Sequence, residues 1–130
     1  MITELIGVQT GSHFEFNDIT HKIEAFITKH NVKEGLCHIY IPHTTCGVTI
    51  NENADPDVKR DMLMELGKIV PLSDGYSHME GNSAAHIKSS LMGFSLSVPV
   101  LEGRLLLGTW QGIYLCEFDG PRNRKVRISV

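Results

Sequence analysis

Three of the seven histidines in the chain stand in polar surroundings where a side chain can reach a ligand. His43 follows a proline at an expected break in a strand, His78 lies in a polar loop, and His86 lies in the first turns of an expected helix. Three neutral imidazoles around one ion, with a fourth position open, form a recognised catalytic metal site. Spacing alone only suggests that these rings meet, because they lack the i, i+4 pairing of zinc-protease helices. A metal or catalytic cluster and three unrelated polar side chains therefore stand as alternatives.

Acidic and amide side chains accompany these histidines. They could orient metal ligands or serve as a general base, and they are Asn51, Glu52, Asp55, Asp57, Glu80 and Asn82. The alternative is that they only cap two helices. Asp55 is such a cap, because Asp followed by Pro is a strong helix start.

Cys46 and Trp110 also invite a chemical interpretation. Cys46 shares a face of its expected strand with Val48 and Ile50, which favours an apolar filler over a reactive thiolate. The only tryptophan, beside Gln111 and between glycines, could line a pocket for a planar ligand, but a core or interface anchor is favoured. No glycine-rich pattern of the P-loop or dinucleotide-binding kind is present, which disfavours nucleotide binding of those kinds.

Hydrophobic periodicity predicts the elements that must position these residues. Alternating or continuous apolar runs predict strands over residues 2–9, 12–16, 36–41, 45–51, 94–101, 104–108, 112–118 and 125–130. Apolar residues at helical spacing predict helices over residues 19–30, 56–69 and 83–92. We expect Val58, Met62, Leu66 and Ile69 to face inward from the second helix, and Ala84, Ile87 and Leu91 from the third.

The order of these elements predicts an α+β fold. Runs of strands favour a two-layer structure, an antiparallel sheet with three helices on one face, ordered β-β-α-β-β-α-α and then three or four strands. Residues 1–130 are expected to form a single domain, since the length suits one core. Apolar residues at 98–101 and 105–107 predict burial against another subunit, and hence a homo-oligomer.

Composition excludes several classes of protein. A net charge of −3 argues against nucleic acid as the main partner. The basic segment 122–127 is interpreted as a solvated strand end, with a local anion site as the alternative. Three unpaired cysteines, no leader-like segment and no run of about 18 apolar residues predict a soluble protein of the cytoplasm, away from membranes.

Three long motifs resemble the YjbQ family, whose members are described as secondary thiamine-phosphate synthases. They are HTTCGVTINENADPDVKRDM, YSHMEGNSAAHIKSSLMG and GRLLLGTWQGIYLCEFDGPRNRKV. The resemblance covers nearly the whole chain. It implies a two-layer α+β fold, a homotrimer, and an active site near the subunit boundary where histidines bind a metal or a sulfate-like ligand.

The resemblance also implies roles for single residues. Metal ligands would be His43, His78 and His86, and catalytic residues Asn51, Glu52, Glu80 and Asn82. Substrate-binding residues would be Lys88, Trp110, Gln111, Arg122 and Arg124. The reaction implied joins a hydroxymethylpyrimidine diphosphate to a thiazole phosphate and releases pyrophosphate.

The identity of the metal and of the reaction stays open at this point. A three-histidine site suits zinc, whereas magnesium on a diphosphate prefers oxygen ligands. One alternative is a hydrolase of a small molecule, with a zinc-bound water and Glu52 or Glu80 as base. Another is a non-catalytic protein that binds an anion or a metabolite in the same pocket.

Overall fold

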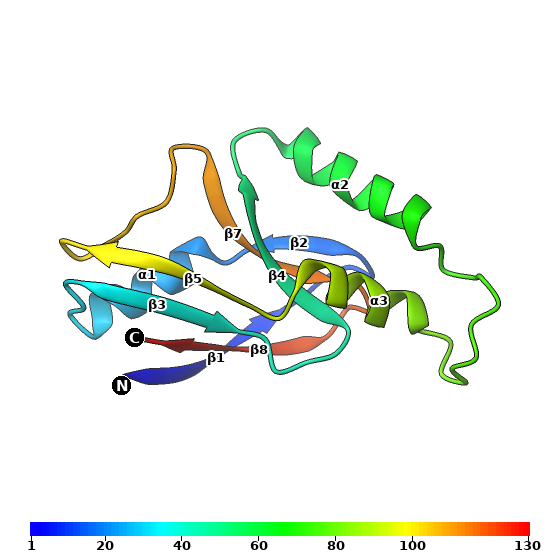
Figure 1. The fold of residues 1–130 in the computed structure, drawn as a ribbon, viewed down its shortest axis with the longest axis horizontal. Coiled ribbons are helices and arrows are strands. Elements are labelled where there is room, and N and C mark those ends of the chain that lie inside the picture. Colours follow the sequence, from blue (N-terminus) through cyan, green and yellow to red (C-terminus); the bar gives the residue numbers. More distant parts are fainter.

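Eight strands and three helices follow one another in the computed structural model, which describes residues 1–130 (Figure 1). The strands are β1 (Thr3–Gln9), β2 (Glu15–Asp18), β3 (Gly35–Tyr40), β4 (Cys46–Glu52), β5 (Ser95–Leu101), β6 (Arg104–Leu105), β7 (Gln111–Glu117) and β8 (Asn123–Ser129). The helices are α1 (Thr20–Lys29), α2 (Pro56–Ile69) and α3 (Ser83–Met92).

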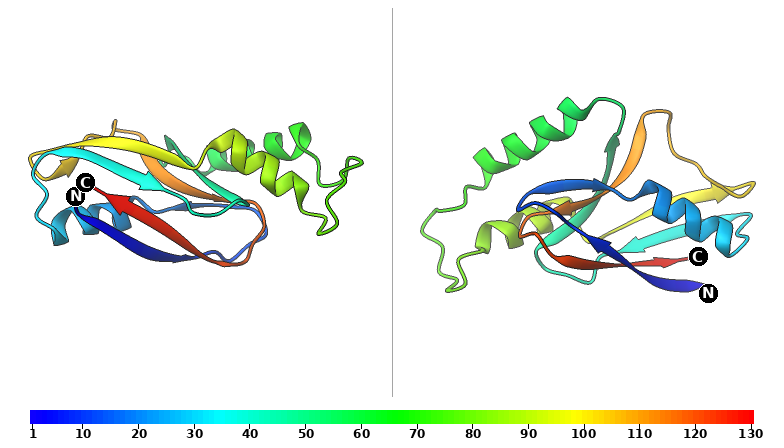
Figure 2. Two further views of the ribbon diagram at one scale, coloured as in Figure 1. Left: turned by 60° about the horizontal axis from the view of Figure 1, so that its bottom comes forward. Right: turned by 180° about the vertical axis from the view of Figure 1, so that it is seen from behind.

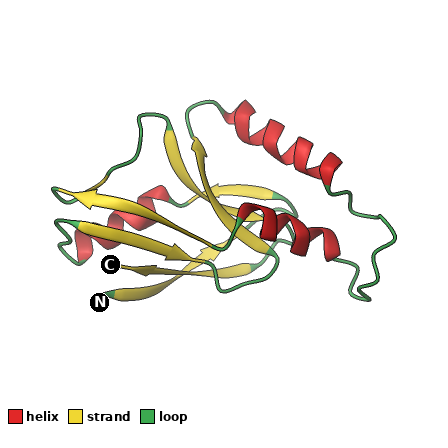
Figure 3. Cartoon of the chain, viewed as in Figure 1, coloured by secondary structure: helices red, strands yellow, loops and turns green.

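All strand pairs are antiparallel, and they form two sheets (Figure 3). The larger sheet has the order β1-β8-β3-β5-β6, and the smaller one has the order β2-β7-β4. The turn between β7 and β8 passes from the smaller sheet to the larger one. The α+β class, the three helices and the antiparallel pairing predicted from the sequence are confirmed.

Strand β7 is apolar on both faces, which determines where the helices lie. Ile113 and Leu115 enter the larger hydrophobic core, while Tyr114 and Cys116 enter a second, smaller core. Helix α1 packs into the larger core, and α2 and α3 pack into the smaller one. The helices thus cover both faces of the smaller sheet, whereas the sequence predicted helices on one face only. The reason is that a strand that is apolar on both faces must be covered on both. Figure 2 shows α1 on the side seen from behind, away from α2 and α3.

Helix α3 approaches β4 closely at Gly47. The Val48 N–H donates a 3.0 Å hydrogen bond to the Gly93 carbonyl, just past the end of the helix. A Cβ atom on Gly47 would lie 2.7 Å from that oxygen and 3.1 Å from the Ser89 carbonyl. The absent side chain at Gly47 therefore sets the position of the helix that carries His86.

The inward face of α3 differs from the one predicted. The buried residues are Ala84, Ala85, Lys88 and Ser89, while Ile87 and Leu91 are exposed. Only Ala84 was predicted correctly. The close contact with β4 selects small side chains, and this outweighs the apolar periodicity.

Helix α2 starts as predicted, because the Asp55 side chain accepts a 2.9 Å hydrogen bond from the Asp57 N–H. The buried face of α2 is narrower than predicted, because Leu66 is buried but Ile69 is exposed. None of the three helices is long and apolar enough to cross a lipid bilayer.

Two strands differ in extent from the prediction. Strand β2 starts at Glu15, since the preceding residues bend beside the β7–β8 turn, where the Gly120 N–H bonds the His13 carbonyl. Strand β6 covers only Arg104–Leu105. Val98 and Val100 belong to the core, so only the ends of this hairpin, at Leu101 and Leu106, expose apolar surface.

Candidate functional site

A polar cavity of about 330 Å³ opens where α3 begins beside the β7–β8 turn. No hydrophobic side chain contributes to its lining. We call it the His/Arg cavity, and its residues are Thr44, Thr45, His78, Glu80, Asn82, His86, Asp119, Arg122 and Arg124.

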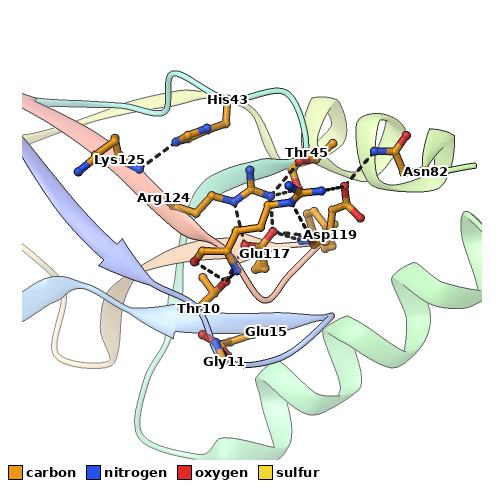
Figure 4. A network of polar contacts seen from close by, with 12 residues as sticks. Thr10, Gly11, Glu15, His43, Thr45, Asn82, Glu117, Asp119, Arg124 and Lys125 are labelled. Atoms are coloured by element: carbon orange, nitrogen blue, oxygen red, sulfur yellow. Dashed lines mark hydrogen bonds and ion pairs between the residues drawn. The ribbon is translucent and has the colours of Figure 1, made fainter. Parts of the chain in front are cut away.

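The floor of this cavity is a buried ion pair between Arg124 of β8 and Glu117 of β7 (Figure 4). The Arg124 Nε donates to Glu117 Oε1 at 2.8 Å, and its Nη2 donates to Glu117 Oε2 and to Thr45 Oγ1. The Thr10 hydroxyl donates to Glu117 at 2.7 Å. Four segments of the chain, which contribute Thr10, Thr45, Glu117 and Arg124, thus meet at this ion pair.

Both members of the pair are charged. Burial alone would raise the pKa of Glu117, but hydrogen bonds from Arg124 and Thr10 hold it below its ordinary value. Burial alone would lower the pKa of Arg124, but the hydrogen bond to Glu117 raises it. The ion pair compensates the desolvation of each partner.

The rim of the cavity is organised by Asp119. Its Oδ2 accepts from Asn82 Nδ2 at 2.9 Å and from Arg122 Nη2 at 3.1 Å. The same Asn82 amide donates to Glu80 at 3.0 Å. These bonds tie the start of α3 to the β7–β8 turn. Burial opposes the charge of Asp119, yet its two donors lower its pKa.

Several polar groups of the cavity have no partner within the chain. The Nη1 groups of Arg122 and Arg124 make no hydrogen bond, although the other nitrogens of both side chains do. The Oδ1 atom of Asn82 is buried without a donor. No side chain caps α3, and its first turn holds no acid. The cavity therefore offers several free donors for an anion, and the carboxylates of Glu80 and Asp119 also line it.

His78 and His86 lie together at this cavity. Their ring centroids are 5.5 Å apart, with the planes nearly perpendicular. His78 is exposed and His86 is half-buried, so both rings are accessible to a ligand from solvent. Loop 78–82 and the first turns of α3 bring them close, as the sequence suggested.

His43 lies apart from these two rings. Its Nε2 accepts a 2.9 Å hydrogen bond from the Lys125 backbone N–H, on the side of Arg124 away from Asn82 in Figure 4. Burial and the Arg124 charge lower the pKa of His43, which favours a neutral ring with Nε2 engaged. No group of three or more His, Cys, Asp or Glu side chains in the chain is arranged to hold a metal ion. The predicted three-histidine set is therefore not assembled within one chain.

Four other predicted site residues gather at the far end of the smaller sheet. We call this group the Trp edge; it comprises Asn51, Glu52, Trp110 and Gln111. Glu52 pairs with Gln111 at one end of the β4–β7 ladder, and Cys46 with Glu117 at the cavity end. At about 3.3 Å per residue, roughly 20 Å separates the two ends. Trp110 is 63% exposed, so it is not a core anchor.

Lys88 and Cys46 also lie outside the cavity lining. Lys88 points from the inner face of α3 towards Phe14 and Phe118. Cys46 is fully buried, and burial raises the pKa of its thiol to about 12. A protonated, inaccessible thiol is not a nucleophile.

Sequence reasoning missed Glu117 and Asp119, the acids that hold the two arginines. The available signal was a glutamate inside the apolar run 113–118, because a buried acid needs a cationic partner.

Comparisons with known proteins agree on one family. Residues 4–130 match the family described as UPF0047 protein YjbQ-like. The UPF0047 protein YugU of Bacillus subtilis is 53% identical over 126 residues, with 96% of each chain covered. An uncharacterised YjbQ/UPF0047 structure from Clostridium acetobutylicum superposes with a TM-score of 0.95 at 49% identity, covering 97% of this chain and 98% of that one. A structure from Sulfolobus solfataricus, described as of unknown function, gives a TM-score of 0.92 at 33% identity, covering 98% and 94%.

Proposed function

Since the chain belongs to the UPF0047 YjbQ-like family, we propose that its His/Arg cavity binds the phosphate groups of a small phosphorylated substrate. The observation that carries this proposal is the pair of guanidinium groups, each with an unpaired Nη1, in a lining without hydrophobic side chains. Two imidazoles and the uncapped first turn of α3 add donors around the same space. Guanidinium groups and helix N-termini are common phosphate ligands.

The rigidity of Arg124 favours binding of a developing charge. Its hydrogen bonds to Glu117 and Thr45 prevent it from turning away, so little reorganisation accompanies the reaction. Arg122, held by Asp119, supplies a second cation at the rim. Such an arrangement suits a leaving group that gains negative charge, as pyrophosphate does.

We therefore propose a transferase of the secondary thiamine-phosphate synthase type. The bond between the pyrimidine methylene carbon and the diphosphate oxygen breaks, and its electron pair leaves with pyrophosphate. The thiazole nitrogen lone pair forms the new carbon–nitrogen bond. Arg122 and Arg124, which both line the cavity, stabilise the departing pyrophosphate.

We also propose that the cavity binds a divalent metal ion, zinc or magnesium. One chain provides only part of the ligands that such an ion needs. His78 and His86 provide two imidazoles, whereas a zinc site usually has at least three protein ligands. Further ligands would have to come from the substrate or a second copy, and no step of the reaction above depends on a metal. Metal analysis of wild-type protein and His86→Ala tests whether an ion is retained.

We further propose that the site is completed in a homotrimer. The Trp edge and the His/Arg cavity lie roughly 20 Å apart in one chain, yet the family resemblance implies that both serve one site. Head-to-tail packing that brings the Trp edge of one copy beside the cavity of the next closes three shared sites around a threefold axis. Trp110 would then provide the aromatic wall for the pyrimidine.

The direct test is condensation turnover by purified His78→Ala and His86→Ala. Each is expected to lose about tenfold or more in kcat/KM, because it removes a hydrogen bond to a charged group. His21→Gln, an exposed histidine on α1, is the matched control and should keep wild-type turnover. Wild-type turnover in both cavity variants would contradict the proposal.

A non-catalytic anion-binding protein is the second candidate. It is favoured by the position of Glu52, which within one chain lies at the Trp edge and not in the cavity. Phosphate binding without condensation or hydrolysis in the wild-type protein would support it. Turnover on simple esters alone would instead support the hydrolase alternative.

A further inference from the structure

A second cavity, of about 310 Å³, lies between α2, α3 and the segment that leads into β2. Its walls are mostly apolar, and Lys88 is the only charged residue in its lining. We call it the Lys88 pocket, and its principal residues are Phe14, Leu63, Met64, Leu72, Lys88 and Phe118.

The Lys88 side chain is buried without a polar partner. The residue is only 3% exposed, and its Nζ lies 4.7 Å from the centre of the Phe14 ring and 5.9 Å from that of Phe118. No carboxylate, hydroxyl or carbonyl oxygen in the chain accepts a hydrogen bond from it. The aromatic rings attract the charge, and the three N–H donors have no partner within the chain and stay free for a ligand in the pocket.

The fold does not explain a lysine at this position. Lys88 shares the inward face of α3 with Ala84, Ala85 and Ser89, where an apolar side chain would bury surface at no electrostatic cost. Lysines that cover apolar surface usually extend their ammonium group into water. Lys88 instead turns its ammonium group into the mostly apolar pocket, where burial lowers its pKa. An ammonium kept among apolar walls points to a ligand that pairs with it.

We propose that the Lys88 pocket binds a small carboxylate with an apolar body. The carboxylate pairs with the Lys88 ammonium, and the hydrocarbon part lies against Leu63 and the exposed side chains at the mouth, Met64 and Leu72. A single cation in an apolar lining matches a monoanion, whereas a phosphate dianion would need further donors. The volume lies at the lower end of ligand pockets, which indicates a small molecule.

The Lys88 pocket is distinct from the His/Arg cavity, with which it shares no lining residue. His86 and Lys88 are two positions apart on α3, and an advance of about 100° per residue places them on opposite sides of the helix. The two sites can therefore be occupied together, and a variant of one leaves the other intact.

Calorimetric titration with octanoate tests the proposal, with octanol as the uncharged probe. Wild-type protein should bind one octanoate per chain, and Lys88→Met should bind it about tenfold more weakly or worse, as expected for loss of a charged hydrogen bond. Octanol should bind both proteins equally weakly. Lys68→Met, on the exposed face of α2, is the matched control and should behave as wild type.

A second variant keeps the test decisive if Lys88→Met does not fold. Gly67 also lines the pocket, and a Cβ atom there would meet nothing within 4 Å, so Gly67→Met should fold and narrow the mouth. It is expected to reduce octanoate binding while leaving pyrophosphate binding unchanged. Absence of saturable octanoate binding by the wild type, or equal binding by all variants, would overturn the proposal.

Discussion

Arg124 and Glu117 meet through two parallel hydrogen bonds beneath the His/Arg cavity, where Arg124 is 4% exposed and Glu117 is fully buried. This pair links β7 of the smaller sheet to β8 of the larger one, and it fixes one wall of the proposed phosphate site. A structural contact between the two sheets thereby also positions a residue of the proposed site.

Replacing Glu117 tests how much this pair contributes. Glu117→Gln removes one charge and leaves the Arg124 guanidinium buried without compensation, so the free energy of unfolding should fall by about 3–5 kcal/mol. Chemical denaturation monitored by circular dichroism measures this free energy of unfolding. Glu24→Gln, an exposed position on α1, should change stability little. Equal stability of both variants would show that the pair is not formed in solution.

Acid should destabilise the fold through the same carboxylate. The pKa of Glu117 in the folded protein lies below its value in the unfolded chain, so its stabilising contribution is full above the unfolded pKa of about 4.3. That contribution is lost as the pH falls through the lower, folded pKa. Denaturation curves between pH 7 and 3 should show a steeper loss of stability for wild type than for Glu117→Gln; parallel loss would contradict this assignment.

Gly47 offers a test of how α3 is positioned. In Gly47→Ala the new methyl group would collide with the carbonyls of Gly93 and Ser89, and an overpacked contact of this kind costs about 1–3 kcal/mol. Turnover should fall as well, since the helix carries His86. The matched control is Gly67→Ala on α2, which meets open space and should stabilise the protein by up to about 1 kcal/mol. Measurements of the free energy of unfolding and of turnover on both variants test these two expectations.

The sequence predicted the elements better than their contacts. Helix starts at Asp55 and Asn82 and the antiparallel strands follow from local signals, so they could be predicted. The inward face of α3 could not, because it depends on the missing side chain at Gly47, a residue of another element. The cytoplasmic location stays a prediction.

The sequence likewise predicted only the part of the candidate site that depends on local signals. Proximity of His78 and His86 follows from a short loop and a helix start. The separation of His43 depends on strand pairing, which places it against Lys125. The roles of Glu117 and Asp119 depend on the turn that joins the two sheets. Such long-range pairings are not encoded in local spacing.

A shared site predicts that two impaired variants can restore each other's turnover. His86→Ala has a damaged cavity and Trp110→Ala has a damaged Trp edge, so each alone should lose about tenfold or more in turnover. Random mixed trimers from co-expressed chains should regain about a quarter of wild-type turnover, since one pairing in four is intact. Mixing His78→Ala with His86→Ala, which alter the same cavity, should restore nothing. Failure of the first mixture to exceed the second would exclude a shared site.

The most direct test of the central claim is calorimetric titration of the protein with pyrophosphate. Wild type should bind one pyrophosphate per chain, and Arg122→Gln should bind it about tenfold more weakly or worse, because it removes a cation with a free Nη1 from the rim. Arg60→Gln breaks only an exposed ion pair with Asp57 and should match wild type. Equal affinities in all three proteins, or no binding to wild type, would contradict the assignment of the His/Arg cavity as a phosphate site.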